Sequence, residues 1–345
     1  MLNNKKILII RLSAIGDTIH TLPMVYTIKS QYPNCKIGWV VEAKAKLFVE
    51  NNPLIDKCFI IDTNRKNLFE IIKQIRKEQY DIALDSQQLF KSGIILGLCA
   101  AKQKITLSGG REFSWIFADK IVKSKTKLFD TNYHVVKRNI ELCEYLGCQA
   151  DEIAFPTPVI SFERKDKVES ILPQNKPIVA IAPATTWINK HISNEIWINI
   201  LDYIQEKYKE KINVILTGSK KEAELINYII EKSKYKSAVN LCGKTNLLEL
   251  LYLYSKCKLV LTPDSGSAHI AWASKEPNII AFFTSTSSKR TGPLGDKYIS
   301  LQSFAQCSPC MKKNCQNKTN KNICTFSFNT DEIKKYIDSF LKNVL

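Results

Sequence analysis

Short apolar segments that alternate with amphipathic helix patterns constrain the fold of this chain most strongly. The apolar segments are predicted to be buried strands, and they lie at residues 5–12, 36–42, 57–62, 81–85 and 103–107, and again at 178–182, 213–217, 238–241, 258–262 and 278–283. The clearest helix pattern has apolar residues at Leu68, Ile71, Ile72 and Ile75, the spacing of one helical face. Strands that alternate with helices form parallel sheets covered by helices, so the sequence predicts an α/β fold of doubly wound, Rossmann-like domains.

A change in composition separates the two series of strands. Residues 150–177 contain four prolines among several charges, and we predict that they connect two domains. We place the first domain at 1–172 and the second at 173–345. Ligands of doubly wound sheets bind at the carboxyl ends of strands, so two facing domains would bind their ligands in the cleft between them.

Apolar spacing also predicts longer helices outside the strands. We expect them at residues 18–30, 134–146, 195–207, 222–232 and 331–345. Gly147 follows the second of these and is a good helix terminator. The last helix is expected to pack on a core through one stripe: Ile333, Tyr336, Ile337, Phe340, Leu341 and Val344.

Two strand-to-helix turns have the composition of a phosphate site. Asp264, Ser265 and Gly266 follow a predicted strand and open a helix, where backbone N–H groups and the helix dipole favour an anion. His269 follows one turn later and could hold another part of a phosphorylated ligand. The corresponding turn in the first domain ends at Asp17. Ordinary helix caps would explain both turns equally well.

Polar residues also follow other predicted strands. Thr185 and Thr186 come directly after the strand at 178–182, and Lys190 follows four residues later. Two hydroxyls and an ammonium group could contact a diphosphate, although a capped loop with a solvated lysine has the same composition. The segments 217–222 and 85–92 end further strands with polar side chains.

The net charge of the chain limits the classes of partner that it is expected to bind. Fifty Lys and Arg residues against 33 Asp and Glu give a formal charge of +17, which favours nucleic acid, an anionic membrane face or a phosphorylated glycolipid. The basic residues are spread out and no nucleic-acid-binding motif is present, so nucleic acid is the weaker alternative. No apolar run approaches the roughly 20 residues that span a bilayer, and we expect no secretion signal.

The chain has eleven cysteines, of which four form a cluster. The other seven lie mostly in apolar segments and are predicted to be small buried side chains. The cluster has the spacing C-x2-C-x4-C-x8-C and comprises Cys307, Cys310, Cys315 and Cys324. A structural zinc site and plain reduced thiols both fit this spacing, and disulfides fit a reducing cytosol less well. Four lysines make the loop basic, which could serve an acidic acceptor or the membrane: Lys312, Lys313, Lys318 and Lys321.

The chain resembles the lipopolysaccharide heptosyltransferases of glycosyltransferase family nine, most of all those of type I. The matching segments occur in the family's order: RLSAIGDTIHTLP at 11–23, WVVEA at 39–43, LDSQQLFKSG at 84–93, ATTWINKH at 184–191 and PDSGSAHIA at 263–271. The resemblance implies the GT-B architecture, two Rossmann-like domains facing across a cleft. It also implies an inverting transfer of heptose from ADP-L-glycero-D-manno-heptose to the Kdo of the lipopolysaccharide inner core. Another nucleotide-sugar donor or acceptor within the family is the alternative.

The resemblance implies a role for each matching residue. Asp17 matches the catalytic base, and Thr185, Thr186 and Lys190 match contacts to the donor phosphates. The donor-binding turn is matched by Asp264, Ser265, Gly266 and His269, the ribose-binding residue by Glu222 and the adenosine region by Lys244. Matched by region alone, the residues that would bind the acidic acceptor are Arg65, Lys66, Lys91 and Arg111. The chain departs from the type I pattern at Trp187-Ile188-Asn189, where an acidic pair is usual, and at Ser267.

These residue types suit the implied chemistry. Transfer with inversion needs one base for the acceptor hydroxyl, and positive charge and N–H donors for the departing diphosphate. Lysine and a helix dipole supply that charge without a metal, so we expect no catalytic cofactor and at most a structural zinc at the cysteine cluster. The implied partners are an ADP-sugar, an acceptor of the Kdo–lipid A type and the anionic face of a membrane. We therefore expect a cytoplasmic enzyme, peripheral to the cytoplasmic face of the inner membrane.

Overall fold

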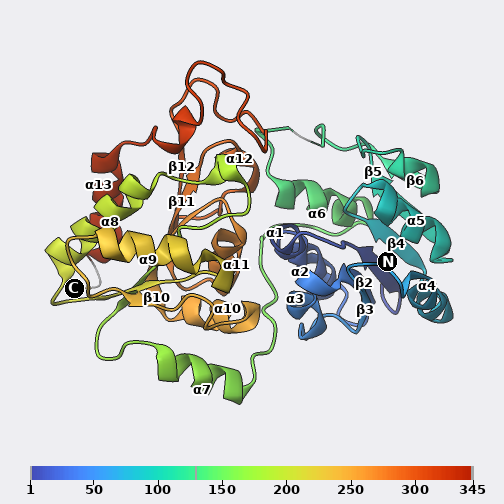
Figure 1. The fold of residues 1–345 in the computed structure, drawn as a ribbon. Helices are drawn as coiled ribbons and strands as arrows, with labels where there is room; N and C mark the ends of the chain where they lie inside the picture. Colours follow the sequence, from blue (N-terminus) through green and yellow to red (C-terminus); the bar gives the residue numbers. More distant parts are fainter. Residues whose placement is uncertain (1, 129, 343–345) are drawn as a thin grey trace. The chain divides into compact units, whose positions relative to one another are not determined.

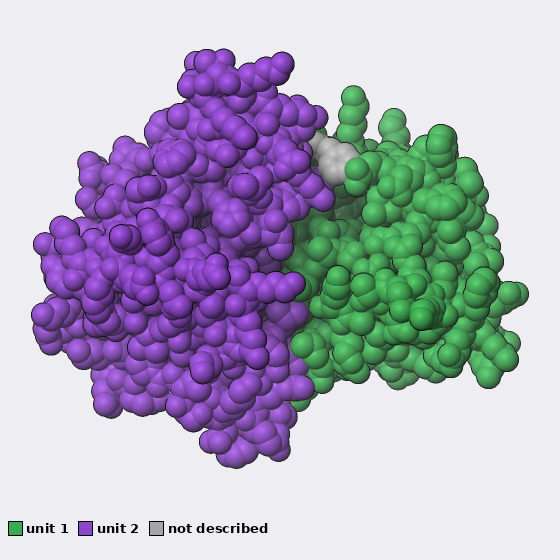
Figure 2. Space-filling view, viewed as in Figure 1, with its two compact units in different colours: residues 1–159 green, residues 160–345 purple. Residues whose placement is uncertain are grey.

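The computed structural model describes residues 2–128 and 130–342, and the chain divides into two compact units (Figures 1 and 2). Unit 1 comprises residues 1–159 and unit 2 residues 160–345. The predicted boundary after residue 172 lies beyond helix α7 (Phe162–Ile171), which belongs to unit 2. Val168 of α7 is fully buried and α7 packs against helix α10 (Leu247–Ser255). The proline-rich connection therefore contains a helix of the second unit.

The sheet of unit 1 has six parallel strands in the order β3-β2-β1-β4-β5-β6. Their bounds are β1 Lys6–Ile10, β2 Lys36–Glu42, β3 Lys57–Ile61, β4 Ile82–Asp85, β5 Gln103–Leu107 and β6 Lys120–Val122. The direction of winding reverses between β1 and β4, which pair directly from Ile7↔Ile82 to Ile10↔Asp85. Open α/β sheets bind their ligands beyond the carboxyl ends of the strands at such a switch point.

The sheet of unit 2 repeats this topology, with the order β12-β11-β10-β7-β8-β9. Its strands are β7 Ile178–Ile181, β8 Asn213–Leu216, β9 Val239–Asn240, β10 Cys257–Pro263, β11 Asn278–Phe283 and β12 Tyr298–Gln302. Numbered within each unit, both sheets have the order 3-2-1-4-5-6 of the Rossmann fold. The switch point of unit 2 lies between β7 and β10. The prediction of two doubly wound domains is confirmed.

Helices surround each sheet (Figure 1). In unit 1 they are α1 Ile15–Ile19, α2 Leu22–Gln31, α3 Leu47–Glu50, α4 Leu68–Lys77, α5 Phe90–Leu98 and α6 Val135–Tyr145. The single helix predicted at 18–30 is wrong, because two helices cover this segment and the first begins at Ile15. Pro23 lies in the first turn of α2, where its missing N–H costs no helical hydrogen bond, so a new helix begins there.

Unit 2 contains the remaining helices. Besides α7 and α10 they are α8 Asn194–Tyr208, α9 Ala223–Lys232, α11 Gly266–Ser274, α12 Ser288–Thr291 and α13 Thr330–Leu341. The apolar stripe of α13 buries Ile333, Ile337 and Leu341 in the core, as predicted. Val344, the last residue of that predicted stripe, lies outside the described residues. Within the described part of the chain, no helix combines the length and apolar character needed to cross a membrane.

The two strands that the sequence analysis missed, β6 and β12, are both sheet edges. All five residues of β12 are only partly buried, and two of the three residues of β6 are exposed. An edge strand pairs on one side only and covers less of the core, so it lacks the continuous apolar run of a central strand. The central strands β1 and β10, by contrast, are almost entirely buried.

Candidate active site

In unit 1, the segments that follow β1 and β4 lie side by side at the switch point. The backbone N–H of Leu12 donates to Gln87 Oε1 at 2.6 Å, and Arg11 Nη1 donates to the carbonyl of Ser86 at 2.6 Å. The RLSAIGD and LDSQQLFKSG segments, more than 70 residues apart in the chain, therefore form one surface.

Asp17 presents an accessible carboxylate at this surface. It lies in the first turn of α1, and its side chain is 43% exposed. Its Oδ1 is 3.0 Å from Arg11 Nη2, and its Oδ2 accepts a hydrogen bond from the Ala14 N–H at 3.2 Å. The Arg11 side chain is only 9% exposed, so a nearly buried guanidinium fixes the orientation of an acid that substrate can reach.

Two further groups of this surface could act as an acid or a base, Asp85 and His20, and both are enclosed. Asp85 has no exposed surface and accepts hydrogen bonds from the N–H groups of Gln87 and Gln88 and from the Ser92 hydroxyl, at 2.9–3.1 Å. Burial raises the pKa of Asp85 to about 6, against these hydrogen bonds and the charge of Arg11. His20 is 1% exposed. Asp85 therefore shapes the loop after β4, and Asp17 is the more accessible of the two carboxylates.

Two of the predicted acceptor residues meet at the carboxylate of Glu42, the last residue of β2. Lys91 Nζ lies 2.8 Å from Glu42 Oε1 and donates to Ser13 Oγ at 3.1 Å, and Arg65 Nη2 lies 3.9 Å from the same oxygen. Sequence reasoning missed Glu42, although it lies within the WVVEA segment. The Glu42 carboxylate therefore holds Lys91 and Arg65 beside the loop that contains Ser13 and leads to Asp17.

The other two predicted acceptor residues lie at the edges of this region. Lys66 is exposed next to Arg65 in the loop after β3, and its backbone N–H donates to Asn64. Arg111 is exposed, and its backbone N–H donates to the carbonyl of Gln88, in the loop that leads to α5, the helix that contains Lys91. The structure thus brings Arg65 and Lys91 together, and a backbone hydrogen bond joins Arg111 to the loop that precedes Lys91.

In unit 2, the segments after β7 and β10 also meet at the switch point. Ala182 N–H donates to the Leu261 carbonyl at 2.9 Å, and Thr185 Oγ1 donates to the Asp264 carbonyl at 3.3 Å. Thr186, the next residue, is exposed. The predicted phosphate contacts and the predicted donor turn therefore occupy one place in the fold.

Asp264 is a buried carboxylate that holds this turn together. Its Oδ2 lies 2.7 Å from Lys190 Nζ and accepts from Thr286 Oγ1 at 2.6 Å, and its Oδ1 lies 3.6 Å from His269 Nε2. Burial alone would raise its pKa, but Lys190, His269 and these hydrogen bonds lower the pKa of Asp264 below its ordinary value. The carboxylate therefore stays ionised and positions Lys190, which contradicts the alternative of a freely solvated lysine. Sequence reasoning missed Thr286, which follows β11.

The start of α11 is open for an anion. Ser265 is the N-cap, and its Oγ accepts from the Ser267 N–H at 3.2 Å. A Cβ on Gly266 would meet no atom within 4 Å, so packing within the chain does not demand glycine there. With no side chain at this position, a phosphate can approach the N–H groups of the first turn closely.

The residues predicted to contact the nucleoside, Glu222 and Lys244, follow the ends of the neighbouring strands β8 and β9. Gly243 N–H donates to the Gly218 carbonyl at 2.7 Å, which joins the loop after β9 to the loop after β8. Glu222 Oε2 accepts from the Ser219 N–H at 2.6 Å, and Lys244 is exposed. One oxygen of Glu222 is thus engaged in capping, and Glu222 and Lys244 belong to one pair of joined loops.

The four clustered cysteines are free thiols of graded exposure, from exposed Cys307 to buried Cys324. Burial first, and then the neighbouring Cys307, Cys310 and Cys315, raise the pKa of the Cys324 thiol to about 11. In residues 2–128 and 130–342, no group of three or more His, Cys, Asp or Glu side chains is arranged to hold a metal ion. Zinc at this cluster therefore stays a prediction.

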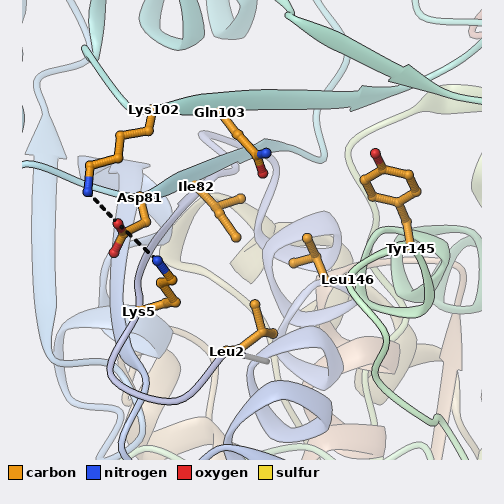
Figure 3. Close-up of a pocket in the computed structure, with 8 residues that line it drawn as sticks. All are labelled: Leu2, Lys5, Asp81, Ile82, Lys102, Gln103, Tyr145 and Leu146. Atoms are coloured by element: carbon orange, nitrogen blue, oxygen red, sulfur yellow. Dashed lines mark hydrogen bonds and ion pairs between the residues drawn. The ribbon is translucent and has the colours of Figure 1, made fainter.

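A pocket of about 550 Å³ in unit 1 lies away from these residues (Figure 3). At its margin, Asp81 forms ion pairs with Lys5 at 3.6 Å and Lys102 at 2.9 Å (Figure 3). These residues immediately precede β1, β4 and β5, at the amino ends of the strands. Because Asp17 follows the carboxyl end of β1, the pocket lies at the opposite edge of the sheet and is not part of the candidate site.

Two Rossmann-like units, each with polar residues at its switch point, are the architecture of the GT-B glycosyltransferases. Residues 68–321, most of the chain, match the model of glycosyltransferase family 9 (heptosyltransferase). The chain belongs to this family and is a glycosyltransferase.

Individual relatives agree with this assignment. The chain is 28% identical over 305 residues to the lipopolysaccharide core heptosyltransferase OpsX of Haemophilus influenzae, covering 84% of this chain and 82% of the relative. Proteins described as heptosyltransferases 1, 2 and 3 also match, so the relatives do not single out one type.

Solved structures share the fold over nearly the whole chain. A family 9 glycosyltransferase of Veillonella parvula superposes with a TM-score of 0.81 at 19% identity, covering 99% of this chain and 98% of the other. The heptosyltransferase WaaC of E. coli, solved with ADP, gives a TM-score of 0.73 at 19% identity over 97% of this chain and 99% of WaaC.

Proposed function

We propose that this glycosyltransferase moves a heptose from ADP-L-glycero-D-manno-heptose to the Kdo of the lipopolysaccharide inner core, with inversion at the transferred carbon. One observation supports this most: an accessible, arginine-held carboxylate lies at one switch point, and a lysine beside an open helix start lies at the other. Relatives named as lipopolysaccharide heptosyltransferases and the ADP in the E. coli WaaC structure support the acceptor class and the donor.

Asp17 acts as the general base in this proposal. Its carboxylate takes the proton of the acceptor hydroxyl while the hydroxyl oxygen attacks the anomeric carbon, and the bond from that carbon to the phosphate oxygen breaks on the opposite side. Arg11 keeps the carboxylate in one orientation at 3.0 Å. A base fixed in this way contributes to the rate through positioning as well as through proton transfer.

Lys190 and the first turn of α11 stabilise the departing ADP. Negative charge grows on the diphosphate as the sugar–oxygen bond breaks, and fixed N–H donors and an ammonium group stabilise that charge. Thr185, Thr186, Ser265, Gly266 and His269 complete the donor-phosphate region, and Glu222 and Lys244 serve the nucleoside. In this proposal no step requires a metal.

Arg65 and Lys91 bind the anionic groups of the acceptor, with Lys66 and Arg111 at the margins. Glu42 holds both central cations in place, and their charge favours an acidic sugar or a phosphate. The net charge of +17 favours a position at the anionic cytoplasmic face of the inner membrane, where such an acceptor would be reached.

A panel of nucleotides tests the donor. ADP and ADP-sugars should raise the melting temperature, because a ligand that binds the folded state at 100-fold its Kd adds about 2.7 kcal/mol of stability. UDP, GDP and their sugars at equal concentration should have little effect. A shift with a UDP- or GDP-sugar and none with an ADP-sugar would show that the assigned donor is wrong.

The same preparation then distinguishes the acceptor types. With the ADP-heptose donor, Kdo–lipid A should gain one heptose in a mass-spectrometric assay. An acceptor that already bears the first inner-core heptose should not react. The reverse preference would assign this chain to a different heptosyltransferase type while leaving the ADP donor unaffected.

We also propose that the cysteine cluster organises its loop and performs no chemistry in the transfer. A loop with so few apolar side chains gains order when thiolates hold a tetrahedral ion. Protein purified without added zinc should contain about one metal ion per chain by elemental analysis, with the four thiols protected from alkylation. A metal content near zero together with four reactive thiols would leave the cluster as ordinary reduced cysteines.

A further inference from the structure

We propose that Lys313, which belongs to the cysteine loop (residues 305–325), lies at the donor site and supplies a second positive charge for the departing diphosphate. The proposal rests on the proposed function, since it assumes that the region of Lys190 binds a nucleoside diphosphate. It assigns the loop a direct part in donor binding, beyond the structural role of its thiols.

The cysteine loop is hydrogen-bonded directly to the segments of unit 2 that form the proposed site for the nucleotide-sugar donor. The side chain of Asn189, next to Lys190, donates from Nδ2 to the Lys312 carbonyl at 3.0 Å. One residue earlier, the Met311 N–H donates to the Ser285 carbonyl at 2.7 Å. Asn189 and Ser285 are both buried, so these bonds hold residues 311–312 against the segments after β7 and β11.

Trp187 brings the two lysines together. Lys190 Nζ lies 4.9 Å from the centre of the indole ring, and Lys313 Nζ lies 5.2 Å from the same centre. Both distances are within the range of a cation–π interaction, which lets two like charges share one aromatic side chain. Because each ammonium group is about 5 Å from one point, the two are at most about 10 Å apart.

The charges at the site explain why a second lysine matters. Lys190 is paired with the buried carboxylate of Asp264, so these two residues together contribute almost no net charge. Lys313 is exposed, and among residues 2–128 and 130–342 no carboxylate forms an ion pair with it. A diphosphate that leaves with growing negative charge is therefore stabilised by Lys313 in addition to the ammonium of Lys190 and the start of α11.

Trp187 and Lys313 form a pair that sequence reasoning could not connect. Trp187 belongs to the segment that departs from the type I pattern. Lys313 was one of four lysines in a basic loop, with no role of its own. The two residues are separated by more than 120 residues, and the fold brings them into contact, in part through the bonds of the cysteine loop to Asn189 and Ser285.

The test compares charge variants by isothermal titration of the full chain with ADP. Lys313→Met removes the charge and keeps most of the stem, and we expect the Kd for ADP to rise about tenfold, equivalent to about 1.4 kcal/mol. Lys313→Arg should bind within about threefold of wild type. Lys318→Met, in the same loop and also exposed, is the matched control and should leave the Kd unchanged.

Salt and a second aromatic variant separate a charge effect from a structural one. The dependence of the ADP affinity on salt should be shallower in Lys313→Met than in wild type, because one charge contact is lost. Trp187→Phe keeps an aromatic ring and should retain most of the affinity, whereas Trp187→Leu should weaken ADP binding as Lys313→Met does.

Two outcomes distinguish the inference from the function on which it rests. If Lys313→Met binds ADP as tightly as wild type while Lys190→Met binds it more weakly, Lys313 has no part in donor binding and the proposed donor site stands. If the wild-type protein does not bind ADP and binds another nucleotide, the proposed donor is wrong. An equal loss in Lys318→Met would also overturn the inference, since the effect would then be general to the loop.

Discussion

Asp17→Asn should transfer heptose about 100- to 10,000-fold more slowly than wild type while folding and binding donor normally. The amide cannot accept the proton of the acceptor hydroxyl, and general-base catalysis contributes a factor of this size. The amide has one acceptor oxygen for two donors, so it keeps either the hydrogen bond from Ala14 or the contact with Arg11. Because the side chain is 43% exposed, the loss of stability should be at most about 1 kcal/mol. Single-turnover rates and thermal melts of the same preparation measure the two effects.

Asp85→Asn is the informative comparison for this variant. Asp85 is fully buried and bonded to the loop after β4, so replacing it should affect the fold rather than the proton transfer. If Asp17→Asn turned over within a few-fold of wild type, Asp17 would be a structural residue of α1. The base would then be a group outside this surface, because His20 and Asp85 are both enclosed.

Lys190→Ala should reduce turnover at saturating donor by about 30- to 900-fold, a loss of roughly 2–4 kcal/mol of transition-state stabilisation like that of one oxyanion donor. The structure also predicts a loss of folding stability, which the sequence did not suggest. Lys190 pairs with a carboxylate that is 3% exposed, and removing one partner of a buried pair is strongly destabilising. We therefore expect Lys190→Ala to melt at a lower temperature as well.

A second substitution separates the two losses. In Lys190→Met/Asp264→Asn both charges are removed, so no unpaired carboxylate remains and most of the stability should return. Turnover should stay low, because the ammonium group is still absent. Recovery of turnover together with stability would show that Lys190 serves the fold alone, and Lys190→Arg, which keeps the charge, controls for the size of the side chain.

The strands and the two-unit organisation were predictable because buried parallel strands have continuous apolar runs. Strands β2, β5 and β11 have the predicted bounds. The prediction errors lie where the local sequence gives a weak or mixed signal. They are the edge strands β6 and β12, the break between α1 and α2 just before Pro23, and α7 inside a proline-rich connection. The edge strands and α7 are fixed by packing against distant residues, whereas the new helix at α2 has a local cause in Pro23.

The candidate site follows the same division. The sequence by itself determined which segments have polar residues directly after a strand. The residue types of turns and helix starts depend on the local backbone conformation, so they can be recognised without the fold. Only the tertiary structure decided which of these segments meet, since strand order is a long-range property: β1 lies beside β4, and β7 beside β10. It also decided what each charge does. Burial enclosed Asp85 and made Asp264 a support for Lys190, and Glu42 holds Arg65 and Lys91. Asp17 stayed accessible to solvent, as the proposed base must be. The free energy of each charge depends on such surroundings, which the sequence does not show.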